Sequence, residues 1–162
     1  MNCCERWPVS RSTRRRSSAL EIRRVSLREA NAFVVAHHRR LGEVRGYFFG
    51  LGLFVAGELR GVAVVGRPTA RMADDGRTAQ VLRLPVNNTK NACSRLYGAV
   101  RRICIEMGLQ AITYTFEDED GTSLRAAGWI AEEWTDGGSW ARANRPRADK
   151  APITPKLRWR AA

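Results

Sequence analysis

The stretch Gln80-Val-Leu-Arg-Leu-Pro85 reads as a short apolar strand, and the residues that follow it decide the fold. The polar segment 87–91 supplies turn and helix-capping chemistry. Apolar residues then recur at helical spacing from Ala92 to Met107, and Gly108 ends the predicted helix. A second strand, Ala111-Ile-Thr-Tyr-Thr-Phe116, follows at once. A helix that begins directly after a strand offers unpaired backbone N–H groups and the positive end of a dipole, which together suit a phosphate.

Further elements are predicted on both sides of this stretch. Segment 20–25 alternates as a strand, and Ser26 with Glu29 forms a capping box that opens a helix ended by Gly42. That helix carries Ala30, Phe33, Val34 and His37 on one side. A hairpin around 56–58 joins strands at 47–55 and 61–65. A short helix at 122–127 and strands at 130–134 and 156–160 complete the chain. The predicted class is α/β (α+β), a mixed, mainly antiparallel sheet flanked by helices.

The order of these elements resembles the core of the GNAT acyltransferase superfamily, in which the turn before the long helix holds the pyrophosphate of acetyl-CoA. It also resembles the small phage and prophage proteins grouped with the Mom DNA-modification protein. The resemblance covers about residues 20–160. It implies a GNAT-like transferase that moves an acyl-type group from an activated donor, acetyl-CoA or another acyl donor, to an amine. In a Mom-like protein that amine would lie on a nucleobase in DNA.

The net charge of +12 is concentrated at the two ends of the chain. Residues 1–18 carry five arginines and one glutamate, and residues 139–162 carry seven basic residues and one aspartate. We expect a disordered basic tail at 1–18 and one GNAT-like domain at 19–162 with a basic loop at 139–155. Such flanks favour a polyanionic partner, most naturally DNA, although basic tails can also serve solubility alone.

Other partners and compartments are constrained by composition. No apolar run approaches the roughly 20 residues that span a bilayer, so we expect no membrane partner and a cytoplasmic protein, in the host cytoplasm if it is encoded by a phage. The four cysteines match neither a disulfide framework nor a zinc-finger spacing. Cys104 falls on the apolar stripe of the long helix and reads as a small buried hydrophobe. The sequence does not indicate an oligomeric state.

The predicted phosphate site departs from the family pattern, because the turn lacks the glycines of the Arg/Gln-x-x-Gly-x-Gly/Ala motif. The residues assigned to donor binding are Lys90, Asn91, Ala92, Cys93, Ser94 and Arg95. The small residues of this turn would still permit close approach, and Lys90 or Arg95 could face a phosphate. The alternative is a well-capped core helix that binds nothing.

Two segments could supply the acid and base of a transferase. Many family members place a tyrosine four residues before the glycine that here is Gly128, as acid to the leaving thiolate, but this chain has Leu124. Ser123 is then the nearest hydroxyl. His37 and His38 are the only histidines, and histidine is a natural base near neutral pH. They could equally cap the helix dipole. A metal is the weaker reading, with iron implied only through the Mom-type resemblance.

The acidic turn after the central strand offers further bases. Strand alternation places Thr113, Thr115 and Glu117 on one face, so Glu117 and Glu119 are the candidates and Thr115 a possible substrate contact. A solvated acidic turn is the alternative.

The basic C-terminal loop is the segment that we connect to a polynucleotide. Arginine forks suit phosphates and a tryptophan offers a stacking face. The assigned substrate-binding residues are Arg83, Thr115, Trp140, Arg142, Arg145, Arg147 and Lys150. A rival function is a nucleic-acid-binding protein that keeps the fold and has lost catalysis, which the missing glycines and tyrosine favour.

Overall fold

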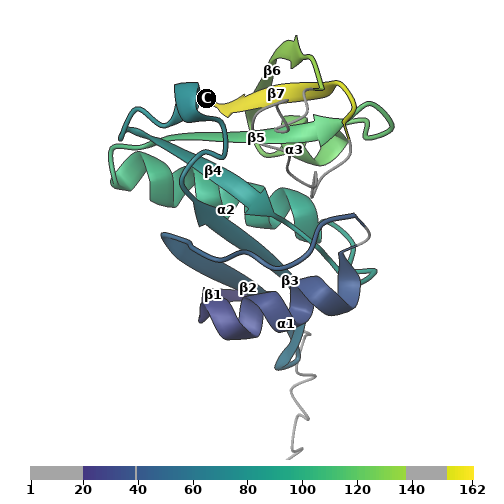
Figure 1. The fold of residues 1–162 in the computed structure, drawn as a ribbon. Helices are drawn as coiled ribbons and strands as arrows, with labels where there is room; N and C mark the ends of the chain where they lie inside the picture. Colours follow the sequence, from purple (N-terminus) through teal and green to yellow (C-terminus); the bar gives the residue numbers. More distant parts are fainter. Residues whose placement is uncertain (1–19, 39, 138–152) are drawn as a thin grey trace, which may run out of the picture.

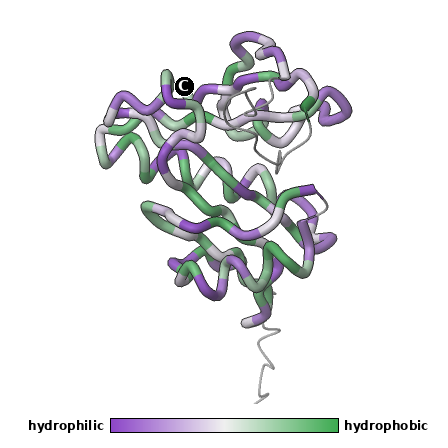
Figure 2. The backbone as a smooth tube through the Cα atoms, viewed as in Figure 1, coloured by the Kyte–Doolittle hydropathy of each residue, from purple (hydrophilic) through white to green (hydrophobic). Residues whose placement is uncertain are grey.

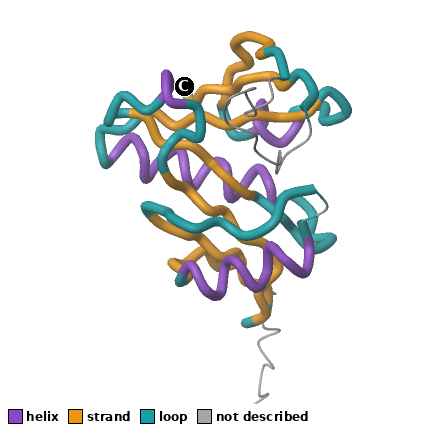
Figure 3. Tube along the Cα trace, viewed as in Figure 1, coloured by secondary structure: helices purple, strands orange, loops and turns teal. Residues whose placement is uncertain are grey.

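A computed structural model describes residues 20–38, 40–137 and 153–162. Seven strands form one sheet in the order β1-β2-β3-β4-β5-β7-β6. The strands are β1 (Leu20–Val25), β2 (Phe49–Val55), β3 (Glu58–Gly66), β4 (Thr78–Arg83), β5 (Gln110–Phe116), β6 (Trp129–Thr135) and β7 (Lys156–Ala161). The helices are α1 (Leu27–His37), α2 (Ala92–Glu106) and α3 (Thr122–Ala126), with a 3-10 turn at Arg71–Ala73. Among the described strands only β4 and β5 pair in parallel, so the expected mixed, mainly antiparallel sheet is confirmed (Figures 1 and 3).

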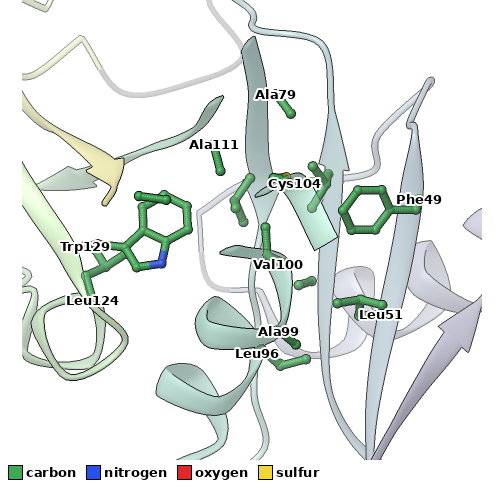
Figure 4. Close-up of a cluster of buried hydrophobic side chains, with 14 of the residues drawn as sticks. Phe49, Leu51, Ala79, Leu96, Ala99, Val100, Cys104, Ala111, Leu124 and Trp129 are labelled. Carbon is green, nitrogen blue, oxygen red and sulfur yellow. The ribbon is translucent and has the colours of Figure 1, made fainter. Parts of the chain in front are cut away.

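The two faces of the sheet carry separate cores. In β3, Val62 and Val64 pack toward α1, whereas Ala63 and Val65 pack toward α2, as the two-residue period of a strand requires. In the larger core, side chains of α2 meet β2 on one side and Trp129 with Leu124 on the other (Figure 4). Cys104 is fully buried there, as a small hydrophobe would be. Hydrophobic residues are concentrated along the strands of the sheet (Figure 2).

Helix α1 begins as predicted but ends earlier. The Ser26 side chain accepts from the Glu29 backbone N–H while the Glu29 carboxylate accepts from Ser26, so the capping box is confirmed. The prediction that Gly42 ends the helix is wrong, because His38 takes an extended conformation (φ −86°, ψ 120°) and the last helical residue is His37. His37 lies on the same side of the helix as Phe33, with ring centroids 4.2 Å apart, but it is exposed.

Some predicted segments lie outside the described residues. These are the tail at 1–18 and most of the basic loop at 139–155. No helix in the described ranges is long and apolar enough to cross a membrane.

Candidate functional site

The parallel ladder between β4 and β5 is short and opens toward the carboxyl ends of the strands. Pairing covers only Thr78 with Gln110, Ala79 with Ala111 and Gln80 with Ile112. Beyond it, the Thr113 hydroxyl donates to the Val81 carbonyl oxygen over 3.3 Å. The following residues of β4 pair with β3, and those of β5 pair with β7. The inner edges of β4 and β5 therefore face one another unpaired past this point, and we call this feature the β4–β5 opening.

Backbone contacts with β3 fix the segment between β4 and α2 in place. Val86 forms an isolated antiparallel bridge with Gly61, and the Asn87 backbone N–H donates to the Arg60 carbonyl oxygen over 2.7 Å. Asn88 (φ 40°) and Asn91 (φ 60°) then adopt left-handed backbone conformations. Asparagine tolerates this region better than most residues other than glycine. Asn91 thus gives the turn a shape that glycine adopts without strain, which is how this chain forms the turn without the family's glycines.

The first turn of α2 presents unpaired donors. Asn91 is the N-cap but its side chain makes no capping hydrogen bond, and the Ser94 hydroxyl donates back to the Asn91 carbonyl oxygen over 3.1 Å. Among the described residues, no oxygen accepts from the backbone N–H of Cys93 or of Ser94. With the helix dipole, these N–H groups form an anion site, which we call the α2 N-terminal site (Asn91–Ser94). Lys90 and Arg95 flank it and are exposed, whereas Ala92 is buried.

Polar groups of α2, β5 and α3 meet beside this site. Burial raises the pKa of the Cys93 thiol, and a hydrogen bond with Ser123 opposes that change. Burial also raises the pKa of Tyr97, and the nearby Cys93 and Glu119 add to the effect. Tyr97 packs edge-on against Trp129, with ring centroids 5.4 Å apart. Both the thiol and the phenol are thus protonated near pH 7, and Ser123 lies close to the α2 N-terminal site.

His38 lies on the other side of the opening, near the end of β4. Its Nδ1 accepts from the backbone N–H groups of Arg40 and Leu41, both over 3.3 Å. Burial, followed by the charge of Arg83, lowers the pKa of His38, so the ring is neutral near pH 7. Because Nδ1 is an acceptor, the proton belongs on Nε2. In this arrangement Nε2 of His38 is available as a hydrogen-bond donor and not as an acceptor.

Arg83 and Arg40 hold the loops around this end of the sheet. The half-buried Arg83 donates from Nε to the Gly42 carbonyl oxygen over 2.9 Å. Arg40 forms a two-pronged ion pair with Asp118 and lies over the Phe116 ring, 4.7 Å from its centroid. Hydrogen bonds from Arg40 lower the pKa of Asp118. The loop after α1 is therefore tied to the turn after β5.

Most carboxylates of that turn have structural partners. Glu119 Oε2 accepts from the Phe116 backbone N–H over 2.8 Å, which leaves Oε1 without a described partner. Asp120 accepts from the backbone N–H and hydroxyl of Thr122, over 3.0 and 2.8 Å. Glu117 is exposed and follows the last residue of β5, so it does not share the buried face of Thr113 and Thr115.

The remaining predicted residues are placed as follows. The buried Thr115 hydroxyl accepts from Trp159 Nε1 over 2.8 Å and is thereby occupied. The predicted positions Trp140, Arg142, Arg145, Arg147 and Lys150 lie outside the described residues. The described part of the chain contains no group of three or more His, Cys, Asp or Glu side chains that could hold a metal ion.

Sequence reasoning missed two participants in this region. The sequence places Arg40 only as a cation near the end of the first helix, because its partner Asp118 is 78 positions away, a distance at which no local pattern connects two residues. Tyr97 was overlooked because it lies on the core side of α2, where an aromatic residue reads as packing. A tyrosine within an otherwise aliphatic stripe was the only available signal.

Comparison with known proteins rests on structure alone. No protein-family model matches this sequence. No curated protein sequence matches it either. Three solved structures illustrate the likeness, and each match covers 88% of this chain and 98% of the other chain. A Bacillus subtilis acetyltransferase in complex with CoA has 11% identity and a TM-score of 0.63. A GNAT-family acetyltransferase from Streptococcus pneumoniae has 10% and 0.60. Arabidopsis thaliana Naa50, in complex with a bisubstrate analogue that contains CoA, has 7% and 0.63.

These identities are low, so the likeness establishes the fold: this chain has the fold of GNAT acetyltransferases. The matched structures give no support to the phage Mom-like branch.

Proposed function

We propose that this protein transfers an acyl group from an acyl-coenzyme A thioester to an amine. The observation that carries the proposal is the β4–β5 opening beside the α2 N-terminal site. An extended chain of amides linked to a pyrophosphate fits this pair of features. Unpaired strand edges can hydrogen-bond an extended amide chain, and the free N–H groups of Cys93 and Ser94 can donate to pyrophosphate oxygens. Two structures with this fold were solved with CoA or a CoA-containing analogue, which supports the choice of donor.

Three side chains around the β4–β5 opening can each take one role in acyl transfer. As the acceptor nitrogen forms a bond to the acyl carbon and the C–S bond breaks, one proton must leave the nitrogen and the sulfur must leave as thiolate. Glu119 is the base that the geometry favours, because Oε1 has no described partner and the side chain lies near Cys93 and Tyr97. Ser123, beside Cys93, can donate a hydrogen bond to the leaving thiolate. His38 Nε2 can donate to the developing oxyanion.

The tyrosine missing at Leu124 does not remove an essential part of this scheme. Leu124 is buried in the larger core and points toward α2 and Trp129 (Figure 4). A thiolate is a good leaving group, since an ordinary thiol has a pKa of about 8.5. Positioning of the amine and charge stabilisation can therefore carry the reaction, with a hydroxyl donor in a supporting role.

The finer proposal is that the amine lies on a nucleobase in DNA. Its support is the charge of +12. A paired base would have to be flipped out or presented single-stranded to reach the opening. Replacing Arg142, Arg145 and Arg147 together by alanine should lower DNA affinity. The slope of log affinity against log salt concentration should become less steep by about 0.9 per lost phosphate contact.

The test combines binding with turnover. Calorimetry should show that acetyl-CoA binds, and thiol release should appear only when an acceptor is added, from a panel of small amines, peptides and DNA. Mass spectrometry of nucleosides from cells with and without the protein should show a modified base if DNA is the acceptor. Binding of DNA without binding of acetyl-CoA would contradict the transferase and favour the alternative, a non-catalytic nucleic-acid-binding protein.

A further inference from the structure

A groove runs along the solvent side of α2, with a volume of about 640 Å³. Six of its lining residues come from the segment that starts at the N-cap of α2, and they recur at helical spacing: Asn91, Ser94, Arg95, Gly98, Arg101 and Arg102. Ala126 and Ala127, at the end of α3, line it as well. We call this feature the arginine groove.

No acidic side chain neutralises the charge of the arginine groove in the described part of the chain. Three arginines line it, and no aspartate or glutamate does so in the described part of the chain. Within the same ranges, none of these arginines forms an ion pair. Arg101 donates from Nε to the Ala162 carbonyl oxygen, whereas Arg95 and Arg102 are exposed. Like charges gathered on one helix face repel one another, and a bound anion removes that repulsion.

Gly98 lies in the middle of the groove and leaves the helix backbone open to a ligand. A Cβ atom built there would meet only the Arg102 guanidinium, at 3.6 Å, which is an ordinary contact. The fold therefore does not require glycine at this position. Glycine costs about 1 kcal/mol relative to alanine inside a helix, so helix propensity disfavours it here and no packing contact requires it.

We propose that the arginine groove binds the phosphate backbone of a single polynucleotide strand. Arg95 and Arg102 are seven residues apart, about 10.5 Å along the helix, and lie on one face. A polynucleotide strand carries one charge for about every 3.4 Å of helix rise, so the two arginines reach phosphates of the same strand. Arginine forks match phosphate geometry. A flat bilayer cannot enter a groove, whereas an extended polyanionic strand can lie along it.

This interaction adds a nucleic-acid contact on the folded domain to the basic ends of the chain. The arginine groove shares Asn91 and Ser94 with the α2 N-terminal site, and its far end at Arg102 lies about two helical turns beyond that site. Strand binding is measured without turnover, so the two proposals are tested independently. Failure to bind a strand would leave the proposed acyl transfer intact, and failure of acyl transfer would leave strand binding intact.

The test is fluorescence anisotropy of a labelled single-stranded oligonucleotide with the full chain, across a series of salt concentrations. Arg102→Glu should weaken binding at least about tenfold and reduce the slope of log affinity against log salt concentration by about 0.7 or more. Arg28→Glu is the matched control, because it makes the same charge change on exposed α1, against the other face of the sheet. It should weaken binding much less.

Gly98→Leu tests the groove without a change of charge. It should block the strand sterically and weaken binding at least about fivefold, while leucine's higher helix propensity keeps the melting temperature equal or raises it. This variant also keeps the test decisive if Arg102→Glu folds poorly.

Three outcomes would overturn the proposal. The first is no oligonucleotide binding by the parent protein. The second is equal affinity for the parent and Gly98→Leu, with Arg102→Glu no weaker than Arg28→Glu. The third is loss of acetyl-CoA binding in both groove variants with oligonucleotide binding unchanged, which would assign the groove to the nucleotide end of the donor.

Discussion

Arg40 and Asp118 form an ion pair across 78 positions of sequence, and this pair joins the loop after α1 to the turn after β5. Both side chains are well exposed, yet the Arg40 guanidinium also lies over the Phe116 ring at the end of β5. The two loops border the carboxyl end of the β4–β5 opening, where the acceptor amine would approach. The pair therefore positions the acceptor side of the proposed site.

Asp118→Asn should weaken acceptor binding without unfolding the protein. Exposed ion pairs contribute little to stability, so the melting temperature at pH 7 should stay within about 2 °C of the parent. The KM for the acceptor should rise at least about threefold, while the KM for the donor stays unchanged. Steady-state kinetics with each substrate varied in turn would check this. An unchanged KM for the acceptor would show that the ion pair does not contribute to acceptor binding.

Ser94→Glu should weaken donor binding by at least about tenfold, because a carboxylate at the α2 N-terminal site repels phosphate. The fold should be retained, since a negative charge in the first turn suits the helix dipole. Ser94→Ala is the matched control and should bind donor nearly as the parent does. Calorimetry with acetyl-CoA measures both variants, and equal affinities for parent and Ser94→Glu would remove this site from the account.

Asn91 should tolerate glycine but not a β-branched residue. Its φ of 60° is left-handed, so Asn91→Gly relieves strain, whereas Asn91→Val should cost about 1–2 kcal/mol of unfolding free energy. Denaturant unfolding would report the difference, and donor affinity should fall with the valine variant alone. Equal stability of the two variants would contradict the backbone conformation described for this turn.

His38 and His37 should differ in their contribution to stability. His38 is half-buried and accepts two backbone hydrogen bonds, so His38→Ala should cost about 1 kcal/mol, whereas exposed His37→Ala should cost little.

The same histidine should give stability a pH dependence. The folded state lowers the pKa of His38 below its unfolded value of about 6.5, so between these two values the unfolded chain binds more protons. Stability from His38 is thus present above pH 6.5 and is lost as the pH falls through the folded pKa. Melting temperatures from pH 5 to 8 should show a slope in the parent that is reduced in His38→Ala. An equal slope in both would assign the effect to other groups.

The sequence predicted the elements of this fold well, because each has a local signal. The Ser26–Glu29 capping box and the apolar stripe of α2 match the structure closely, and the Ala56-Gly57 turn falls within the predicted hairpin. The end of α1 was misjudged, because Gly42 is a conspicuous stop signal whereas His38 leaves the helix through its side-chain contacts with Arg40 and Leu41.

The site was harder to predict from the sequence, because the roles of its residues depend on backbone conformation and on contacts that include distant segments. The α2 N-terminal site follows from strand–turn–helix order, but Asn91 as a left-handed substitute for glycine becomes visible only in the backbone. The acidic turn suggested several bases, yet Asp118 is paired with Arg40, 78 positions away, which no spacing rule reveals. Glu119 and Asp120 accept hydrogen bonds from neighbouring residues of the same turn.

The most direct test of the central claim is a titration of the ¹⁵N-labelled protein with acetyl-CoA, followed through its backbone amide resonances. The account predicts saturable shifts of the Cys93 and Ser94 amides and of the amides along the β4–β5 opening, with the α1 amides of Arg28 and Asn31 unchanged. Saturation of the protein without a shift at Cys93 and Ser94, or no binding at all, would contradict it.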